Sequence, residues 1–254
     1  MKVFLTLLVL FSWNHTYSQW LISDHTEGQG SGIGAFDAMN FGMTDLGGVS
    51  LTVDGGETFI HYDFIDADEN LFDSFLPNDL EYFSPNIIYC SGQIPFVSRE
   101  IVAKSIDGGS TWEFIYYEPG EGILNDLHIT QAGTIFIVGS DGRVLKSEDE
   151  GLTWNRLANA GSGRLSALYA FDNYNISVGG DQGIFTTTNG GLSWRHFDTD
   201  FPINGIAYQN EEIIMAVTEG DEELYTTDSG NEWLSRESEL TDIVDVAHFE
   251  NDVW

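Results

Sequence analysis

The stretch Ser105-Ile106-Asp107-Gly108-Gly109-Ser110-Thr111-Trp112 decides the fold, because close copies of it recur along the chain. The other copies occupy residues 52–59, 147–154, 187–194 and 226–233. Each keeps the order Ser or Thr, Asp or Asn, Gly, then Trp or Phe. Consecutive copies begin 53, 42, 40 and 39 residues apart. Self-similarity at a near-constant spacing of this length is the signature of a repeat architecture.

The chemistry of each copy is that of a tight turn between two strands. The Asp or Asn side chain accepts hydrogen bonds from N–H groups of its own turn, and the glycine two positions later permits a positive φ. The aromatic residue that follows then enters the next strand as a large core anchor. We expect a structural role for Asp54, Gly56, Phe59, Asp107, Gly109, Trp112, Asp149, Gly151, Trp154, Asn189, Gly191, Trp194, Asp228, Gly230 and Trp233.

Between these copies the sequence alternates as strands do. In the third repeat, residues 124–129 and 134–138 read as two strands. A turn at 139–142 leads to a third strand at 143–146 and a fourth at 154–157. Four short antiparallel strands per repeat make one propeller blade. The sequence therefore predicts an all-β fold, a β-propeller with five evident blades.

The two ends of the chain carry further expectations. Residues 1–18 resemble a secretory signal peptide, since Lys2 precedes an apolar run at 3–11 that is too short to span a membrane permanently. With no cysteine near the cut after Ser18, we expect a secreted or periplasmic protein that is not a lipoprotein. Residues 19–254 form the expected propeller. Within it, 19–24 would supply a ring-closing strand and 242–254 would begin a sixth blade that is incomplete at the C-terminus, as in a fragment of a larger propeller.

Charge and cysteine content exclude several classes of partner. The formal net charge is −32, from 9 basic and 41 acidic residues. Such an acidic chain repels nucleic acid and anionic membranes, because phosphate binding needs clustered Lys and Arg. The single cysteine, Cys90, lies in an apolar run and is expected to be a buried packing residue.

The repeated pattern resembles the Asp-box, or BNR, repeat. The longer unit from Leu124 to Trp154 is most similar to the photosystem II stability and assembly factor family and its secreted bacterial relatives. More distantly it resembles the propellers of sialidases, sortilin-type receptors and xyloglucan-degrading enzymes. The resemblance covers about residues 30 to 254, with Phe59 and Asn189 as departures from the pattern. It implies a propeller, but the same repeat serves enzymes, receptors and assembly chaperones.

The sequence offers two classes of function. In a propeller, the loops joining the second strand to the third and the fourth to the next first lie on the channel face, where chemistry would come from Asp79, Asp126, Arg143, Arg164, Asn204 and Asp245. A sialidase-like site needs three arginines, for which Arg99, Arg143 and Arg164 are available, but Gln93 stands where the Arg-Ile-Pro motif needs its arginine. Asp79 and Asp126 are either a glycosidase carboxylate pair or caps of repeated strands. We expect no catalytic residue and a non-catalytic binding or assembly module. The alternative is a glycoside hydrolase of sialidase-like or xyloglucanase-like type.

Two insertions break the repeat, around residues 64–77 and 91–100. Both fall on the expected channel face, and long loops on a rigid scaffold commonly carry function. They predict a site for a protein or glycan partner, and no cofactor is expected except a possible calcium ion held by the alternating oxygens of Asp66, Asp68 and Asn70. The candidate binding residues are Asp66, Asp68, Asn70, Phe72, Phe75, Phe96, Arg99, Asp79, Asp126 and Asp245.

Overall fold

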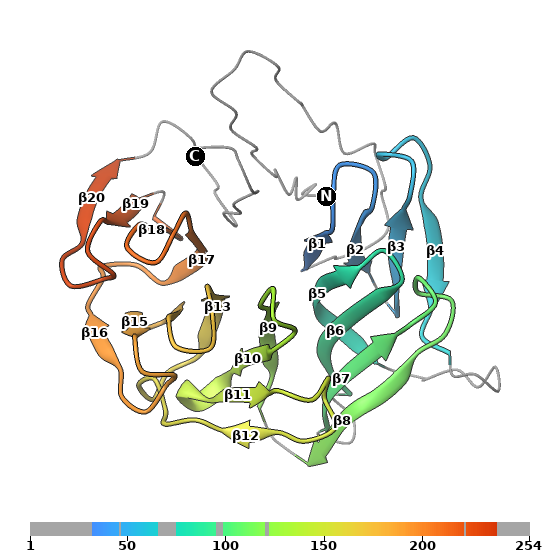
Figure 1. The fold of residues 1–254 in the computed structure, drawn as a ribbon, viewed down its shortest axis with the longest axis horizontal. Helices are drawn as coiled ribbons and strands as arrows, with labels where there is room; N and C mark the ends of the chain where they lie inside the picture. The colour runs from blue at the N-terminus through green and yellow to red at the C-terminus, as the bar shows by residue number, and fades with distance from the viewer. Residues whose placement is uncertain are drawn as a thin grey trace. The chain divides into compact units, whose positions relative to one another are not determined.

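The computed structural model describes residues 32–45, 47–65, 75–94, 99–119, 122–220 and 222–237. In these residues the chain forms five four-stranded antiparallel sheets, each a meander of consecutive strands, and one short 3-10 turn, η2 (Ser140–Gly142). Figure 1 shows the five sheets, which we call blades 1 to 5 in chain order. Five successive meanders, each closed by the repeated turn, are the blades of a β-propeller.

The blades differ in strand length. Blade 1 consists of β1 (Ile33–Ala35), β2 (Phe41–Asp45), β3 (Gly48–Thr52) and β4 (Ile60–Asp63), and blade 2 of β5 (Leu76–Ser84), β6 (Ile87–Ile94), β7 (Arg99–Ser105) and β8 (Glu113–Pro119). Blade 3 consists of β9 (Leu124–Ile129), β10 (Ile135–Gly139), β11 (Val144–Ser147) and β12 (Asn155–Arg156). Blade 4 consists of β13 (Leu165–Ala170), β14 (Ile176–Gly180), β15 (Gly183–Thr187) and β16 (Arg195–Phe197), and blade 5 of β17 (Ile203–Tyr208), β18 (Ile214–Thr218), β19 (Glu222–Thr226) and β20 (Leu234–Glu237).

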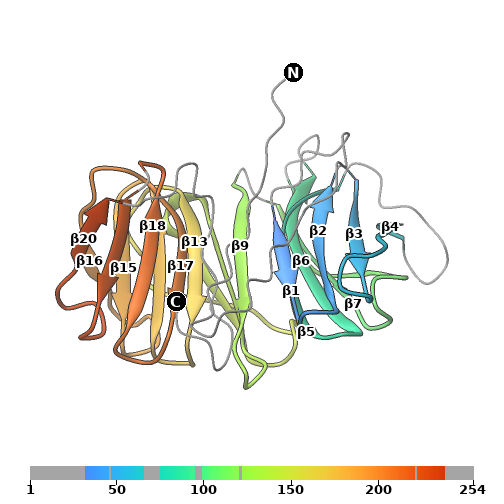
Figure 2. The same ribbon diagram turned by 90° about the horizontal axis from the view of Figure 1, so that it is seen from above.

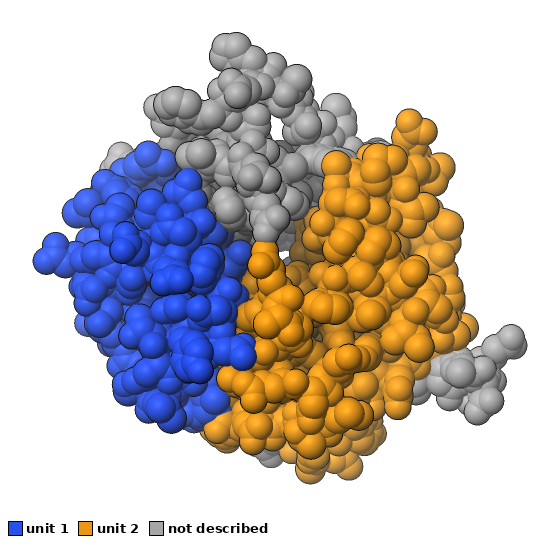
Figure 3. Space-filling view, in the orientation of Figure 1, with its two compact units in different colours: residues 1–27, 157–254 blue, residues 28–156 orange. Residues whose placement is uncertain are grey.

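The chain divides into two compact units, coloured separately in Figure 3. Blades 1 to 3 belong to the unit of residues 28–156, and blades 4 and 5 lie between residues 165 and 237 of the other unit. In the first unit, β1, β5 and β9 lie side by side (Figures 1 and 2). Asn78 Nδ2 donates to Leu124 O at 2.8 Å across β5 and β9. In the second unit, Ser166 Oγ makes the corresponding bond from β13 to Ile203 O of β17 at 2.8 Å.

The repeated turn has the same hydrogen bonds in every blade. In blade 2, the Ser105 hydroxyl accepts the Gly109 N–H at 2.8 Å, and Asp107 Oδ1 accepts the Thr111 N–H at 2.8 Å. In blade 4, Asn189 Oδ1 accepts the Ser193 N–H at 3.1 Å. We call these five segments the box turns: residues 52–59, 105–112, 147–154, 187–194 and 226–233. Asparagine in place of aspartate keeps this hydrogen bond, because the turn needs only an acceptor oxygen at this position.

Each box turn contains two successive residues in the left-handed region. The second is always glycine, with φ between 77° and 92° at Gly56, Gly109, Gly151, Gly191 and Gly230. The first is glycine in blades 1, 2 and 4, but Glu150 (φ 60°) in blade 3 and Ser229 (φ 59°) in blade 5. A side chain is costly in this region, so blades 3 and 5 store strain that the other blades avoid.

The aromatic residues that end the box turns differ in burial. Trp112 and Trp233 are 2% and 8% exposed, whereas Phe59, Trp154 and Trp194 are only half-buried. The sequence had suggested a core anchor at all five positions. The difference arises because the aromatic residue precedes the outermost strand of its blade, so its burial depends on what other segments place against it.

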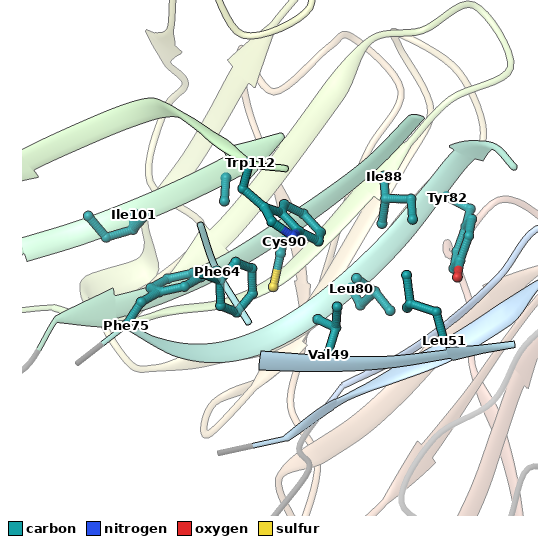
Figure 4. Packing of buried hydrophobic residues seen from close by; sticks show 11 residues of the cluster. Val49, Leu51, Phe64, Phe75, Leu80, Tyr82, Ile88, Cys90, Ile101 and Trp112 are labelled. Atoms are coloured by element: carbon teal, nitrogen blue, oxygen red, sulfur yellow. The ribbon is translucent and has the colours of Figure 1, made fainter. Parts of the chain in front are cut away.

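Blade 2 supplies such a segment for Trp112. Figure 4 shows Phe64, Phe75 and Trp112 together beside Cys90. The ring centroids of Phe64 and Phe75 are 4.5 Å apart, and those of Phe64 and Trp112 are 4.8 Å apart. Cys90 is fully buried among them, and burial raises the pKa of its thiol well above the usual value. The cysteine is therefore a packing residue.

Three expectations fall outside the described residues: the signal peptide at 1–18, the ring-closing strand at 19–24 and the incomplete blade at 242–254. In the part of the chain that the structure describes, no helix has the length and apolar character needed to cross a bilayer.

Candidate functional site at the loop end of blades 2 and 3

Each blade has two ends. The box end carries the box turn and the turn between the first and second strands. The loop end carries the turn between the second and third strands and the connection to the next blade. Blades 2 and 3 start alike at the box end, with Ser105 opposite Ile88 and Ser147 opposite Ile135. At the loop end, the β6–β7 pair continues to Ile94 opposite Arg99, whereas the β10–β11 pair stops at Val138 opposite Val144. The extra length of blade 2 is therefore at the loop end.

This extension brings Glu100 to Arg143 of blade 3. Both guanidinium Nη atoms contact the carboxylate, with Nη2 and Oε1 2.6 Å apart. The Glu100 side chain is 1% exposed and that of Arg143 is 15% exposed. Gly122 lies against this ion pair: a Cβ at position 122 would meet the Arg143 guanidinium and the Glu100 carboxylate, which would have to shift. Two-point contacts of this kind are among the strongest and most directional charge pairs in proteins.

On the opposite face of the blade 2 sheet, where Ile101 and Phe114 pack with Phe75 rather than with β9, an aromatic stack reaches the surface. Arg99 places its guanidinium carbon 5.1 Å from the centroid of the Tyr117 ring. Tyr117 in turn stacks on Phe114, with 6.0 Å between centroids and 13° between planes. Tyr117 remains 47% exposed. The Arg99 guanidinium lies over the face of the Tyr117 ring, which is a favourable cation–π geometry. Because the ring is partly exposed, a binding partner could cover it without displacing any residue of the core.

A pair of carboxyl groups lies between the innermost strands β5 and β9. The Asp79 carboxyl hydrogen-bonds to Asp126 and accepts the Leu127 N–H at 3.0 Å. Two carboxyl groups hydrogen-bond to each other only when one of them keeps a proton. Asp79 keeps some exposed surface, but dense protein surroundings desolvate its carboxyl and raise its pKa to about 6, against the opposing effect of these hydrogen bonds.

The carboxyl pair is confined to two blades. Strand register places Asp79 and Asp126 at the same position of blades 2 and 3, where blades 4 and 5 have Ala167 and Gly205. Two positions further along, Glu81 and His128 approach to 3.4 Å. The acids are therefore a local feature of the β5–β9 contact, rather than a device of every blade.

The structure places only part of the predicted binding set. Arg99, Asp79 and Asp126 lie at the loop end of blades 2 and 3, as described above. Phe75 is 1% exposed and packs on Phe64, so it has no surface to offer a partner, and its expected binding role is corrected to packing. The physical reason is that the insertion begins and ends in the core. Outside the described residues are Asp66, Asp68, Asn70, Phe72, Phe96 and Asp245.

The three arginines considered for a sialidase-like site have separate surroundings. Arg143 is held by Glu100, and Arg99 covers Tyr117. Arg164 belongs to the other unit, where its Nε lies 3.5 Å from Asp181 Oδ1. Asn204, the remaining channel-face candidate among the described residues, lies in β17 of that unit.

Sequence reasoning missed Glu100 and Tyr117. Counting back from the first residue of each box turn, Glu100 occupies the place of Gly142 in blade 3, Gln182 in blade 4 and Asp221 in blade 5. Since blade 5 also has an acidic residue there, this position alone gave no signal for the ion pair. The partner of Glu100, Arg143, lies 43 residues away.

The geometry has consequences for chemistry. Glycoside cleavage needs two carboxyl groups about 5 to 9.5 Å apart, with the sugar between them. Asp79 and Asp126 are instead in hydrogen-bond contact. Over the described ranges, no group of three or more His, Cys, Asp or Glu side chains is arranged to hold a metal ion. The charged groups between blades 2 and 3 are thus already satisfied by one another, and the exposed Arg99–Tyr117 surface lies on the other face of the blade 2 sheet.

A search against protein-family models found no match. Among curated proteins, the vacuolar protein sorting/targeting protein 10 of Mycosarcoma maydis is 28% identical over 94 residues, which make up 33% of this chain and 6% of that protein. The matched segment is therefore a small part of a much longer relative.

Solved structures give a broader match. A structure of YCF48 bound to D1 peptide has a TM-score of 0.62 and 16% identity, covering 87% of this chain and 71% of that one. YCF48 from Cyanidioschyzon merolae has a TM-score of 0.55 and 16% identity, covering 85% and 88%. The GH74 xyloglucanase from Xanthomonas campestris has a TM-score of 0.60 and 16% identity, covering 81% of this chain and 38% of the enzyme. These likenesses show the fold: the chain is a β-propeller of four-stranded blades, similar to YCF48, GH74 and sortilin-type propellers, as predicted.

Proposed function

We propose that this protein is a secreted or periplasmic, non-catalytic propeller that binds a protein partner at the loop end of blades 2 and 3. The observation that carries the proposal is the exposed Arg99–Tyr117 stack on the extended edge of blade 2. Arginine and tyrosine are enriched where protein partners bind, since both bury large surfaces and keep polar contacts. Of the structural neighbours, YCF48 is one whose structure contains a bound peptide.

The satisfied state of the charged groups supports binding over catalysis. A glycosidase acid must face its substrate, but the Asp79 carboxyl is occupied by Asp126 and the Leu127 N–H. An arginine that grips a substrate carboxylate must be free, but Arg143 is engaged at both ends of its guanidinium by Glu100. The competing function, a xyloglucanase-like hydrolase, rests on the GH74 neighbours.

Binding is tested with a peptide array and a glycan array probed by the same purified protein. We expect selective peptide binding, reduced at least tenfold by Tyr117→Ala. The matched control is Tyr174→Ala, which removes a ring that is 65% exposed at the box end of blade 4. Equal binding by both variants and the parent would contradict the proposed surface. Glycan binding lost only in Tyr117→Ala would keep the surface and change the partner class.

Catalysis is tested on the same protein with sialosides and xyloglucan. We expect no hydrolysis above that of heat-inactivated protein. Turnover of either substrate that disappears in Asp79→Asn would establish the hydrolase instead. Because Asn keeps the shape of the side chain and its hydrogen-bonding capacity, loss of turnover would not reflect loss of the fold.

The inserted segments belong to the same proposal. Phe64 and Phe75 contact each other, so residues 66–74 can be replaced by a short Gly-Ser linker while the core pair is kept. If the insertion contributes to the site, this variant loses peptide binding. The proposed calcium site at Asp66, Asp68 and Asn70 predicts a melting temperature that rises with calcium in the parent and not in the variant. Proposed export is tested by N-terminal sequencing of the mature protein, expected to begin at residue 19.

A further inference from the structure

Apolar side chains project from the turns at the box end of blades 1 to 3. Exposed fractions are 44% for Phe36, 51% for Met39, 70% for Val53, 42% for Phe83, 69% for Ile106 and 84% for Leu152. We call these six residues the box-end patch. All belong to one compact unit. These side chains leave between about two fifths and four fifths of their surface uncovered by the chain. A group of exposed apolar residues at one end of the blades marks an interaction surface.

The six residues lie at the same end of the three blades because the inner strands of these blades run in the same direction. Inner strands β1, β5 and β9 are neighbours in the same direction: Gly32 and Gly34 approach Asp79 and Leu80, and Asp79 bonds to Leu127. The two turns of one blade are tied together at this end, as in the 3.1 Å bond from the Gly55 N–H to Met39 O. In blade 2 the Gly108 N–H donates to Asn86 O at 3.0 Å in the same way.

The patch also joins neighbouring blades. A Cβ built on Gly133, in the first turn of blade 3, would lie 3.5 Å from the ring of Phe83 in blade 2. The Phe83 ring therefore lies against the turn of the next blade, and its outer surface continues from one blade to the other.

The turns do not require these side chains. Val53 and Ile106 occupy the position held by Glu148, Thr188 and Thr227 in the other box turns. Leu152 occupies the position held by Glu57, Ser110 and Asn231, and also by Leu192 of blade 4, which is 82% exposed. All five box turns nevertheless make the same bond from the second glycine's N–H to the Ser or Thr hydroxyl, at 2.8 to 3.1 Å. Since polar residues serve the turn equally well, the apolar ones have another use.

The carboxylates around the box-end patch determine which charge a binding partner should carry. Asp37, Asp54 and Asp107 stand among the patch residues, and hydrogen bonds from the Thr58 hydroxyl and N–H keep the pKa of Asp54 down at about 2. The nearby lysines are neutralised: Lys104 Nζ lies 2.8 Å from Glu150, and Lys146 Nζ lies 2.7 Å from Glu148. The patch is thus apolar with a negative surround.

We propose that the box-end patch is a docking surface for a cationic amphipathic segment of a partner protein. Leucine-like side chains of the segment cover the patch, and its lysines or arginines face the carboxylates around it. A second copy of this chain fits poorly, since it would bring another strongly acidic surface to the same place. The surface is separate from the loop-end site proposed above, so either proposal can fail alone.

The test uses the full-length protein and two fluorescein-labelled peptides of equal charge, one of leucine and lysine and one with every leucine replaced by serine. Anisotropy should show at least tenfold tighter binding of the leucine peptide. The variant Met39→Gln/Val53→Thr/Ile106→Thr, which borrows threonine from blades 4 and 5, should lose that preference. Leu234→Thr, which changes a residue 57% exposed on β20, is the matched control and should keep it.

Each other outcome overturns the proposal. Equal affinity for the two peptides, or no effect of the triple variant at an unchanged melting temperature, means that charge alone attracts the peptide. A parent dimer in light scattering that the triple variant converts to monomer identifies a second copy as the occupant. Sedimentation with phosphatidylcholine vesicles that the triple variant abolishes identifies a lipid surface.

Discussion

At their box ends, blade 2 and blade 4 are built alike. In both, a Ser or Thr hydroxyl accepts the N–H of the second glycine, at 2.8 Å in blade 2 and 3.1 Å in blade 4. That glycine lies against a leucine of the preceding blade in both cases, but at different positions: Leu51 of β3 for Gly109, and Leu157, which follows β12, for Gly191. The repeated sequence therefore produces a repeated structure wherever the contacts are local.

At their loop ends the two blades diverge. Strand β7 of blade 2 has 7 residues and β8 has 7, whereas β15 and β16 of blade 4 have 5 and 3. The extra residues of blade 2 hold Arg99 and Glu100, which contact Tyr117 and Arg143. The comparison shows that the blades share the same turn structure at their box ends and differ in strand length at their loop ends. Proteins whose loops carry the function have the same division between a regular framework and variable loops.

The largest expected effect is a difference in stability between two variants that remove the aromatic residue at the end of a box turn. Trp112→Ala should lower the free energy of unfolding by about 3 to 5 kcal/mol, since the ring is buried against Phe64. Trp194→Ala should cost about 1 to 2 kcal/mol, because the half-buried ring loses less contact. Urea denaturation measures both. Equal costs would show that the aromatic cluster of blade 2 adds nothing to the repeat.

The next effect concerns the ion pair that only blade 2 has. Glu100→Ala should cost about 2 to 4 kcal/mol, because it leaves the largely buried Arg143 guanidinium without its carboxylate partner. The control is Gln182→Ala at the same repeat position of blade 4, where the side chain accepts the exposed N–H groups of Ser162 and Gly163. It should cost less than about 1 kcal/mol. A Glu100→Ala protein as stable as the control would contradict the role given to the pair.

Replacing the second glycine of the box turn by alanine should lower the stability of blades 2 and 4 by equal amounts. Gly109→Ala and Gly191→Ala each force a Cβ to 2.6 Å from a leucine methyl at positive φ, so each should cost about 2 to 3 kcal/mol. Gly47→Ala has the same kind of φ but nothing within 4 Å, and should cost only about 1 kcal/mol. Thermal unfolding distinguishes these cases. Unequal costs for the first two variants would break the likeness of the blades.

The acid pair predicts a pH dependence confined to the contact of blades 2 and 3. The folded-state pKa of Asp79, about 6, exceeds its ordinary value, so the folded protein binds more protons than the unfolded chain between about pH 4 and 6. Stability from this group is therefore present at pH 4 and lost as the pH rises through 6. Asp79→Asn should be more stable than the parent at pH 7 by about 1 to 2 kcal/mol, with the gain vanishing near pH 4. A gain independent of pH would show that Asp79 is not protonated.

The smallest effect concerns the strained residue of blade 3. Glu150→Gly relieves a positive φ but removes a surface ion pair with Lys104, so the expected net gain is about 0.5 kcal/mol. A double-mutant cycle with Lys104→Met separates the two contributions. Blade 4 already has glycine, Gly190, at the position equivalent to Glu150. A loss of stability in Glu150→Gly would mean that the ion pair outweighs the strain.

Much of this fold was readable in the sequence. The five copies predicted the five box turns and the meanders between them, because a turn of eight residues is specified by its own hydroxyl, carboxyl and glycine. The apolar run around Cys90 predicted its burial. The site was less readable. The second insertion predicted extra length at the loop end of blade 2, which the structure shows, and the binding role of that end stays a prediction. Phe75 is buried rather than available for binding, and the pairing of Glu100 with Arg143 was not predicted.

Sequence by itself determined the repeat, the strand order within each blade and the positions of the box turns, since all of these depend on residues close together in the chain. Tertiary structure alone decided which aromatic residues are buried, which acid meets Arg143 and that Asp79 meets Asp126. Those contacts join residues more than 30 positions apart, and their energies depend on how neighbouring blades exclude water. The local sequence does not show how far water is excluded. An aspartate at the end of a strand can be solvated in one structure, and in another it can be desolvated and share a proton with a second carboxyl group.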